Sequence, residues 1–262
     1  MSRLKIVKSN QVEILLELLV AELTSHPLVS PLTPEVIVTP SPAMARWVQL
    51  GLARQAGVAM NVEYPLPASY VWSLCANLLQ DLPQTDPLTL DVMVWKIFKA
   101  LPGLLPAPAF EALRRYLMSD PHGLKRWQLA NRIADAFDRY QLYRPAQIRL
   151  WGDKTPAELA DDWQGLLWRH LVTGLEASHR VAVIDRLLVV MAQAPAMALL
   201  PERVSLFAVS TLPPLLVEVI HGLGCHTAVD LYLHAPTDQF WADLITEKAM
   251  ARKRLETPDE AD

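Results

Sequence analysis

The stretch EVIVTPSPAMARWVQLGLA, residues 35–53, contains a strand, a loop and a helix in direct succession. Residues 35–39 form a short β-branched run, which is typical of a strand buried in a parallel sheet. Pro40 and Pro42 then interrupt the extended chain. Apolar residues recur at the helical period over 44–52, and Gly57 is a plausible stop. Trp47 lies on this apolar stripe, so we expect it to pack in a core.

The same strand-to-helix order occurs near both ends of the chain. Residues 4–7 form a β-rich run, and apolar residues follow at helical spacing from 12 to 20. Further along, the apolar helix pattern of 215–223 lies between two strand patterns at 204–209 and 227–233. Units of this kind place their strands parallel, so the sequence predicts an α/β fold with one sheet of about four parallel strands.

The middle of the chain has a different sequence pattern. Strand patterns almost vanish between about 64 and 200, and amphipathic segments separated by prolines replace them, at 68–80, 88–100, 107–118, 123–142, 157–175 and 180–194. We therefore predict that residues 1–64 and 201–246 form the α/β core and that residues 65–200 form an inserted helical subdomain. The segment 247–262 is expected to be a charged tail.

Composition restricts the classes of protein to which the chain can belong. Of its 262 residues 52% are apolar, the net charge is −4, and no run approaches the roughly 18 to 20 apolar residues of a membrane span. A secretory signal is also missing from the first residues, so we expect a cytoplasmic protein. Cys75 and Cys225 lie far apart in the sequence, which favours two buried thiols over a disulfide or zinc site. Seven histidines include no HxH or HExxH pair, so capping or solvated roles are favoured over metal binding.

Neither of the first two strand-to-helix turns has the composition of a phosphate-binding loop. Such loops place glycine amides on the phosphates and a lysine at the start of the helix. The first turn is KSNQ at 8–11, and the second is TPSPAMAR at 39–46, and both lack glycine. We therefore expect no ATP site and no cofactor.

Flat rings and guanidinium groups gather near predicted loop or helix ends. They are Arg46 and Trp47, then Tyr64, Tyr70 and Trp72, and then the run from Arg139–Tyr140 to Tyr143–Arg144. Proteins that bind single-stranded nucleic acid pair stacking rings with cations in this way. Asp135 and Asp138 share a helix face, a spacing compatible with acid–base chemistry. Because Arg132 and Arg139 lie on the same stretch, a solvated ion-pair face is the favoured interpretation.

The order of these motifs resembles the N-terminal region of the RecC family, the gamma chains of the exodeoxyribonuclease V (RecBCD) helicase-nuclease. The most specific matches are NVEYPLPASYVW at 61–72, DRYQLYRP at 138–145 and STLPP at 210–214. The resemblance implies the first domain of a superfamily 1, P-loop-type helicase with a helical insertion, from which the ATPase motifs have been lost. Family members are several times longer, so we expect a fragment.

The resemblance also implies a function. RecC chains are non-catalytic subunits that hold the beta and alpha motor chains (RecB- and RecD-like), help to split duplex DNA at its ends, and guide the single strand through channels where the Chi signal is read. Two alternatives remain open. The chain could be a free-standing DNA-binding or adaptor domain, or an active NTPase.

Carried over position by position, the single-strand contacts of the family fall on Arg46, Leu66, Trp72, Asp135, Asp138 and Arg139. We predict that Trp72 stacks on a base, that Arg46 and Arg139 contact phosphates, and that the aspartates accept from base amino groups or exclude a misplaced backbone. Arg46 itself departs from the family pattern, in which an amide side chain is expected at this position. Residues 39–46 depart from the family pattern, because Pro40 and Pro42 have no side-chain donor or acceptor. Direct base readout by this segment is therefore in doubt. The alternative is that Trp72 lies in the core and the aspartates pair with Arg132 and Arg139.

Overall fold

The computed structural model describes residues 4–79, 81–82, 86–193, 199–235 and 237. Its centre is one sheet of five strands, all parallel, in the order β1-β5-β4-β2-β3. The strands are β1 (Leu4–Ser9), β2 (Glu35–Val38), β3 (Val62–Glu63), β4 (Arg203–Phe207) and β5 (Ala228–His234). The predicted α/β class and parallel sheet are confirmed, and strands from both ends of the sequence pair as expected. The additional strand β3 has only two residues, too few to produce a sequence pattern.

Alternation along the strands separates two apolar faces. Val36, Val204 and Val229 stand in register across β2, β4 and β5, and their side chains join the larger of two hydrophobic clusters. Ile37, Phe207 and Tyr232 belong to the smaller cluster. Because successive side chains point to opposite sides of a strand, the two sets mark the two faces of the sheet.

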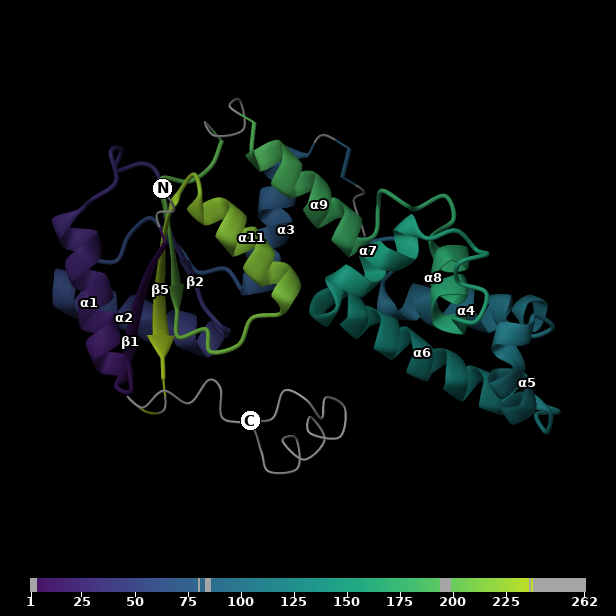
Figure 1. Ribbon diagram of the computed structural model, residues 1–262. Coiled ribbons are helices and arrows are strands. Elements are labelled where there is room, and N and C mark those ends of the chain that lie inside the picture. The colour runs from purple at the N-terminus through teal and green to yellow at the C-terminus, as the bar shows by residue number, and fades with distance from the viewer. Residues whose placement is uncertain (1–3, 80, 83–85, 194–198, 236, 238–262) are drawn as a thin grey trace, which may run out of the picture.

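Helices α1 (Val12–Ser25) and α2 (Pro42–Ala56) cover the face of the smaller cluster, and α3 (Pro67–Leu78) and α11 (Pro214–Gly224) lie on the other side (Figure 1). The first turn of α2 is capped by the Ser41 hydroxyl, which accepts from the Met44 amide at 3.2 Å. Helix α2 ends at Gly57, whose φ of 81° is left-handed. Trp47 packs against the smaller cluster as predicted, with its ring centroid 6.1 Å from that of Phe207.

All described elements between β3 and β4 are helical, and most of them extend away from the sheet (Figure 1). After α3 come α4 (Leu90–Leu104), the 3-10 turn η1 (Pro108–Phe110), α5 (Glu111–Leu117), α6 (Leu124–Tyr143), α7 (Pro145–Asp153), α8 (Trp163–Val172) and α9 (Arg180–Met191). Helix α7 was not predicted, because it follows α6 after a break at Arg144 alone. The helix predicted over 157–175 covers only 163–172, since turns occupy its first part and Asp162 caps α8.

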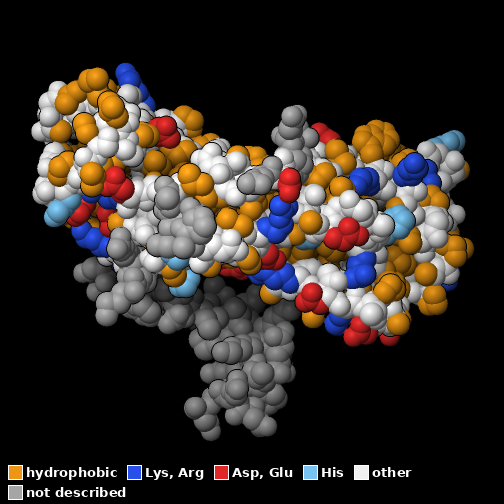
Figure 2. Space-filling model, turned by 90° about the horizontal axis from the view of Figure 1, so that it is seen from above, with side chains coloured by type: hydrophobic (Ala, Val, Ile, Leu, Met, Phe, Trp, Pro, Cys, Tyr) orange, Lys and Arg blue, Asp and Glu red, His pale blue; other side chains and the backbone are white. Residues whose placement is uncertain are grey.

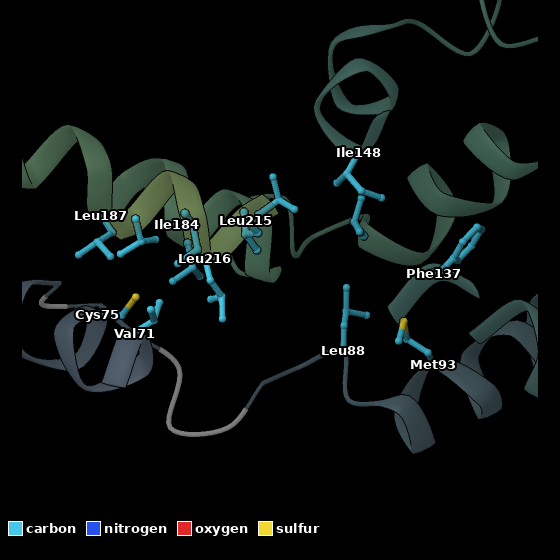
Figure 3. Close-up of a cluster of buried hydrophobic side chains, with 14 of the residues drawn as sticks. Val71, Cys75, Leu88, Met93, Phe137, Ile148, Ile184, Leu187, Leu215 and Leu216 are labelled. Atoms are coloured by element: carbon cyan, nitrogen blue, oxygen red, sulfur yellow. The ribbon is translucent and has the colours of Figure 1, made fainter. Parts of the chain in front are cut away.

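One core joins the helices to the sheet. Figure 3 shows Val71 and Cys75 of α3 facing Ile184 and Leu187 of α9, with Leu215 and Leu216 of α11 beside them. The same cluster continues through Leu88, Met93, Phe137 and Ile148 among the outer helices. The division into a core and a subdomain inserted at 65–200 remains a prediction, and the tail at 247–262 lies outside the described residues.

The prediction of two buried thiols is wrong for one of them. Cys75 is fully buried in α3, whereas Cys225 is exposed. Cys225 directly follows the last residue of α11, so it is not on the apolar stripe of that helix. Within the described ranges, no helix has the length and apolar character needed to cross a membrane.

Candidate functional site

A groove of about 630 Å³ opens where α3, α6, α9 and α11 meet. Its apolar wall contains Trp72, Leu142 and Leu215, and its polar rim contains Asp86 and Arg180. Trp72 is half-buried and packs against the larger cluster while its side chain lines the groove. Trp72 therefore packs against the core, as one interpretation predicted, and also lines the groove, while its stacking on a base stays a prediction.

The start of α3 positions Trp72. Pro65, Leu66 and Pro67 lead out of β3, and Leu66 occupies the N-cap position with extended backbone angles and a side chain that is 39% exposed. Pro67 stands at the first helical position, where its fixed φ suits the helix and its missing N–H costs nothing. The Thr39 amide donates to the Pro65 carbonyl at 3.0 Å, so the segments that precede α2 and α3 adjoin at the carboxyl edge of the sheet.

Arg180, the first residue of α9, joins two carboxylates at the groove. Its Nε lies 2.9 Å from Asp86 and its Nη1 lies 2.8 Å from Asp138 on α6. The Arg180 amide also donates to the buried Gln141 side chain at 3.2 Å, and the Gln141 Nε2 has no partner among the described residues. Sequence reasoning missed Arg180 and Asp86, because 94 residues separate them and no local pattern connects them.

The two aspartates of α6 have different partners. Asp135 pairs with Arg139 at 3.0 Å, one helical turn away, and both side chains are about half exposed or more. This pair is the one that the ion-pair interpretation predicted. Asp138 instead pairs with Arg180, so the predicted pairing of the aspartates with Arg132 and Arg139 is correct only for Asp135.

Arg46 lies apart from the groove. It is exposed on α2, which covers the opposite face of the sheet from α3, and its guanidinium donates to Gln49 at 2.9 Å. Of the predicted residues, Trp72 lines the groove, Asp138 is joined to it through its ion pair with Arg180, and Leu66 lies at the start of the same helix as Trp72. Arg46 stays on a different surface, and Asp135 and Arg139 form an exposed pair on α6.

The turn at 8–11 is joined to the end of β5 by hydrogen bonds. The Ser9 hydroxyl accepts from the Gln11 amide at 3.0 Å, and the Ser9 carbonyl accepts from the Ala235 amide at 2.9 Å. The His234 Nε2 lies 3.2 Å from the Asn10 carbonyl. In the part of the chain that the structure describes, no cluster of three His, Cys, Asp or Glu side chains could hold a metal ion.

Comparison of the sequence with known proteins shows the family of the chain. The family described as RecC, N-terminal domain, matches residues 4–262. The chain belongs to the RecC family. Three RecC relatives, each named RecBCD enzyme subunit RecC, come from Haemophilus influenzae, Escherichia coli and Mycolicibacterium smegmatis. They are 32%, 32% and 30% identical to this chain over 90%, 92% and 90% of its length. The chain spans 22–24% of the length of these RecC proteins.

Proposed function

We propose that the chain is a non-catalytic part of a RecBCD-type helicase-nuclease, in which it guides single-stranded DNA released from duplex ends. The observation that carries the proposal is the groove between α3 and α6, where an accessible tryptophan adjoins a cluster of charged side chains. A ring of this kind stacks on any base, and the adjoining polar groups can then discriminate between bases.

Each of the six predicted contact residues has a role in this proposal, whether it lies at the groove or on another surface. Trp72 stacks on a base, and Leu66 supports the apolar entrance at the start of α3. Asp138 uses one oxygen for Arg180, which leaves its other oxygen to accept from the exocyclic amino group of a base. Asp135 does the same on the exposed face, and Arg139 and Arg46 contact phosphates. Carboxylates repel phosphates, so they serve base readout here and not backbone affinity.

The fold supports a helicase-like scaffold that does not hydrolyse ATP. Five parallel strands with helices on both faces match the architecture of a nucleotide-binding domain. The turn at 8–11 nevertheless has no glycine amides for a triphosphate, and it is tied to β5. Binding of ATP to the purified chain at micromolar affinity, measured by calorimetry, would contradict this part of the proposal and favour an active NTPase.

The test of the groove uses the complex assembled with its beta and alpha chains. Trp72→Ala should weaken binding of single-stranded DNA by about 1–3 kcal/mol, because the lost contact is a stacking contact. Trp72→Phe is the matched control, since it keeps a flat ring and should lose less. Fluorescence anisotropy of a labelled oligonucleotide measures both, and equal loss in the two variants would show that the ring does not stack.

A variant of Arg46 tests the proposed contact between this residue and a phosphate of the single strand. Arg46→Ala should lower the slope of log affinity against log salt by about 0.7, since one phosphate contact to a single strand is lost. Arg54→Ala, in the last turn of the same helix, is the control and should leave the slope unchanged. Unchanged slopes in both variants would remove Arg46 from the interface.

The proposed partners are the RecB-like beta chain and the RecD-like alpha chain. A pull-down with the two separately purified chains tests them, with circular dichroism to show that this chain is folded. Retention of either motor chain is the expected result. Retention of neither would favour the alternative of a free-standing DNA-binding or adaptor domain.

A further inference from the structure

A second aromatic surface lies at the end of the molecule away from the sheet, where α4, α5 and the start of α6 meet (Figure 1). We call Trp95, Phe98, Tyr116 and Trp127 the aromatic tip. Trp95 is 61% exposed and Tyr116 is 49% exposed. The rings of Trp95 and Trp127 lie 4.7 Å apart, and Phe98 meets Trp95 edge-on at 6.0 Å. Such exposure of large rings in a cluster marks a binding surface, whereas a single exposed apolar residue does not.

The surroundings of the aromatic tip are positively charged. Residues 90–132 contain seven Lys and Arg against three Asp and Glu, although the whole chain has a net charge of −4. Glu111 is neutralised by Arg115 at 2.6 Å, and the Asp120 carboxylate accepts from the backbone amides of Lys125 and Arg126. Figure 2 shows Lys and Arg side chains interspersed with hydrophobic and acidic ones at the corresponding end of the molecule.

Cations also lie directly on the rings. The Arg126 guanidinium lies 4.0 Å from the centre of the Phe98 ring, and the Lys125 ammonium lies 5.6 Å from that of Tyr116. Neither Lys125 nor Arg126 has a carboxylate ion-pair partner in the described ranges. The Lys125 ammonium donates instead to the Ser119 hydroxyl at 2.6 Å, so no carboxylate in the described ranges forms an ion pair with either cation.

A groove of about 560 Å³ opens beside these rings, lined by Tyr116, Trp127, Gln128, Leu129, Asn131 and Arg132. The Asn131 amide nitrogen donates to the Trp127 carbonyl at 2.8 Å, which leaves its carbonyl oxygen as an acceptor. The side chains of α5 and α6 that line the groove thus include two flat rings, an amide acceptor and a guanidinium group. A nucleobase and its phosphate require this combination.

We propose that the aromatic tip and its lysines and arginines form a second binding surface for single-stranded nucleic acid. Bases stack on Trp95 and Tyr116, and Lys125 and Arg132 hold the phosphates. The local excess of positive charge favours this polyanion over a protein partner, because protein interfaces enriched in aromatic residues are depleted of lysine. The aromatic tip shares helix α6 with the Trp72 groove but no lining residue, so the proposal does not rest on that site.

The test uses the full chain and a fluorescein-labelled oligothymidylate, with binding followed by anisotropy over a series of salt concentrations. Trp95→Ala and Tyr116→Ala should each weaken binding roughly 5- to 100-fold, the range expected for loss of one stacked base. Lys125→Gln and Arg132→Gln should each lower the salt slope by about 0.7. Val189→Ala on exposed α9 and Arg54→Gln on α2 are the controls and should leave binding unchanged.

Thermal melting by circular dichroism checks that each variant is folded, which is expected because Trp95 and Tyr116 are largely exposed. The proposal is overturned if the oligonucleotide does not bind, or if Trp72→Ala weakens binding while the tip variants do not. The latter outcome would support the Trp72 groove alone. It is also overturned if the tip variants lose only the binding of purified beta or alpha chain, since the tip would then be a protein interface.

Discussion

At the scale of single residues, the two cysteines should differ in reactivity. Burial raises the pKa of the Cys75 thiol to about 11, so its reactive thiolate is scarce at neutral pH and shielded as well. Cys225 is exposed at the end of α11. We expect a maleimide reagent to modify Cys225 rapidly in the folded chain and Cys75 only after unfolding, as measured by mass spectrometry of peptides. Cys225→Ser is the control, and rapid labelling that persists in this variant would contradict the prediction.

At the scale of elements, the cap that His179 provides at the start of α9 should make the stability of the fold depend on pH. Its Nδ1 accepts from the Ala182 amide at 3.3 Å, which requires a neutral ring, and burial lowers its pKa below the ordinary value of 6.5. The unfolded chain therefore binds this proton more readily than the folded chain. The contribution of neutral His179 to the free energy of unfolding is complete above about pH 6.5, the pKa of the unfolded chain. It is lost as the pH falls below that value.

His179→Asn keeps a capping oxygen and removes the titration. The free energy of unfolding, measured in urea, should fall more steeply for the natural chain than for this variant as pH drops from about 7 to 5. Parallel curves for the two proteins across this range would show that His179 is not the titrating group.

At the scale of the whole molecule, Arg149 on α7 connects three helices. Its guanidinium binds Asp185 of α9 and Glu218 of α11, each at 2.6 Å from Nη2, and all three side chains are about a third exposed. These carboxylates raise the pKa of Arg149, the Glu218 hydrogen bond most of all. Arg149→Met leaves the two carboxylates facing each other and should destabilise the fold by about 1–2 kcal/mol, after allowance for solvent screening.

Because one core runs from the sheet to the outer helices, this loss should shift a single unfolding transition. Far-ultraviolet circular dichroism and tryptophan fluorescence in urea should give the same midpoint. Arg115→Met, which breaks the exposed pair with Glu111, is the control and should leave the urea midpoint nearly unchanged, because solvent screens this pair. Two separate transitions in the natural chain would argue against a shared core.

The sequence predicts this fold well where a pattern is local and long. The β-branched runs at 35–39 and 204–209 predict buried strands, and the 3.6-residue period predicts α1, α2, α6 and α11. The two-residue strand β3 is too short to produce a sequence pattern. Helix α7 begins at Pro145, only two residues after α6 ends, so its pattern is not separate from that of α6. Of the candidate site, the family motifs predict Trp72 and Asp138. The ion pairs of Arg180 with Asp138 and Asp86 depend on the tertiary fold, because these partners lie 42 and 94 positions away from Arg180 in the sequence.

The pairing of β2 with β4 determines the order of events during synthesis. Arg203 and Glu35 form an ion pair across these neighbouring strands, yet 168 residues separate them in the chain. At a translation rate of roughly 5–20 residues per second, β2 waits on the order of 10–30 s for its central partner to be made. During that interval the helices from α3 to α9 complete their local contacts, while the aliphatic face of β2 stays without β4. We expect the sheet to close only after β4 is made, from this middle strand outward, and a chaperone that shields β2 to act within this interval.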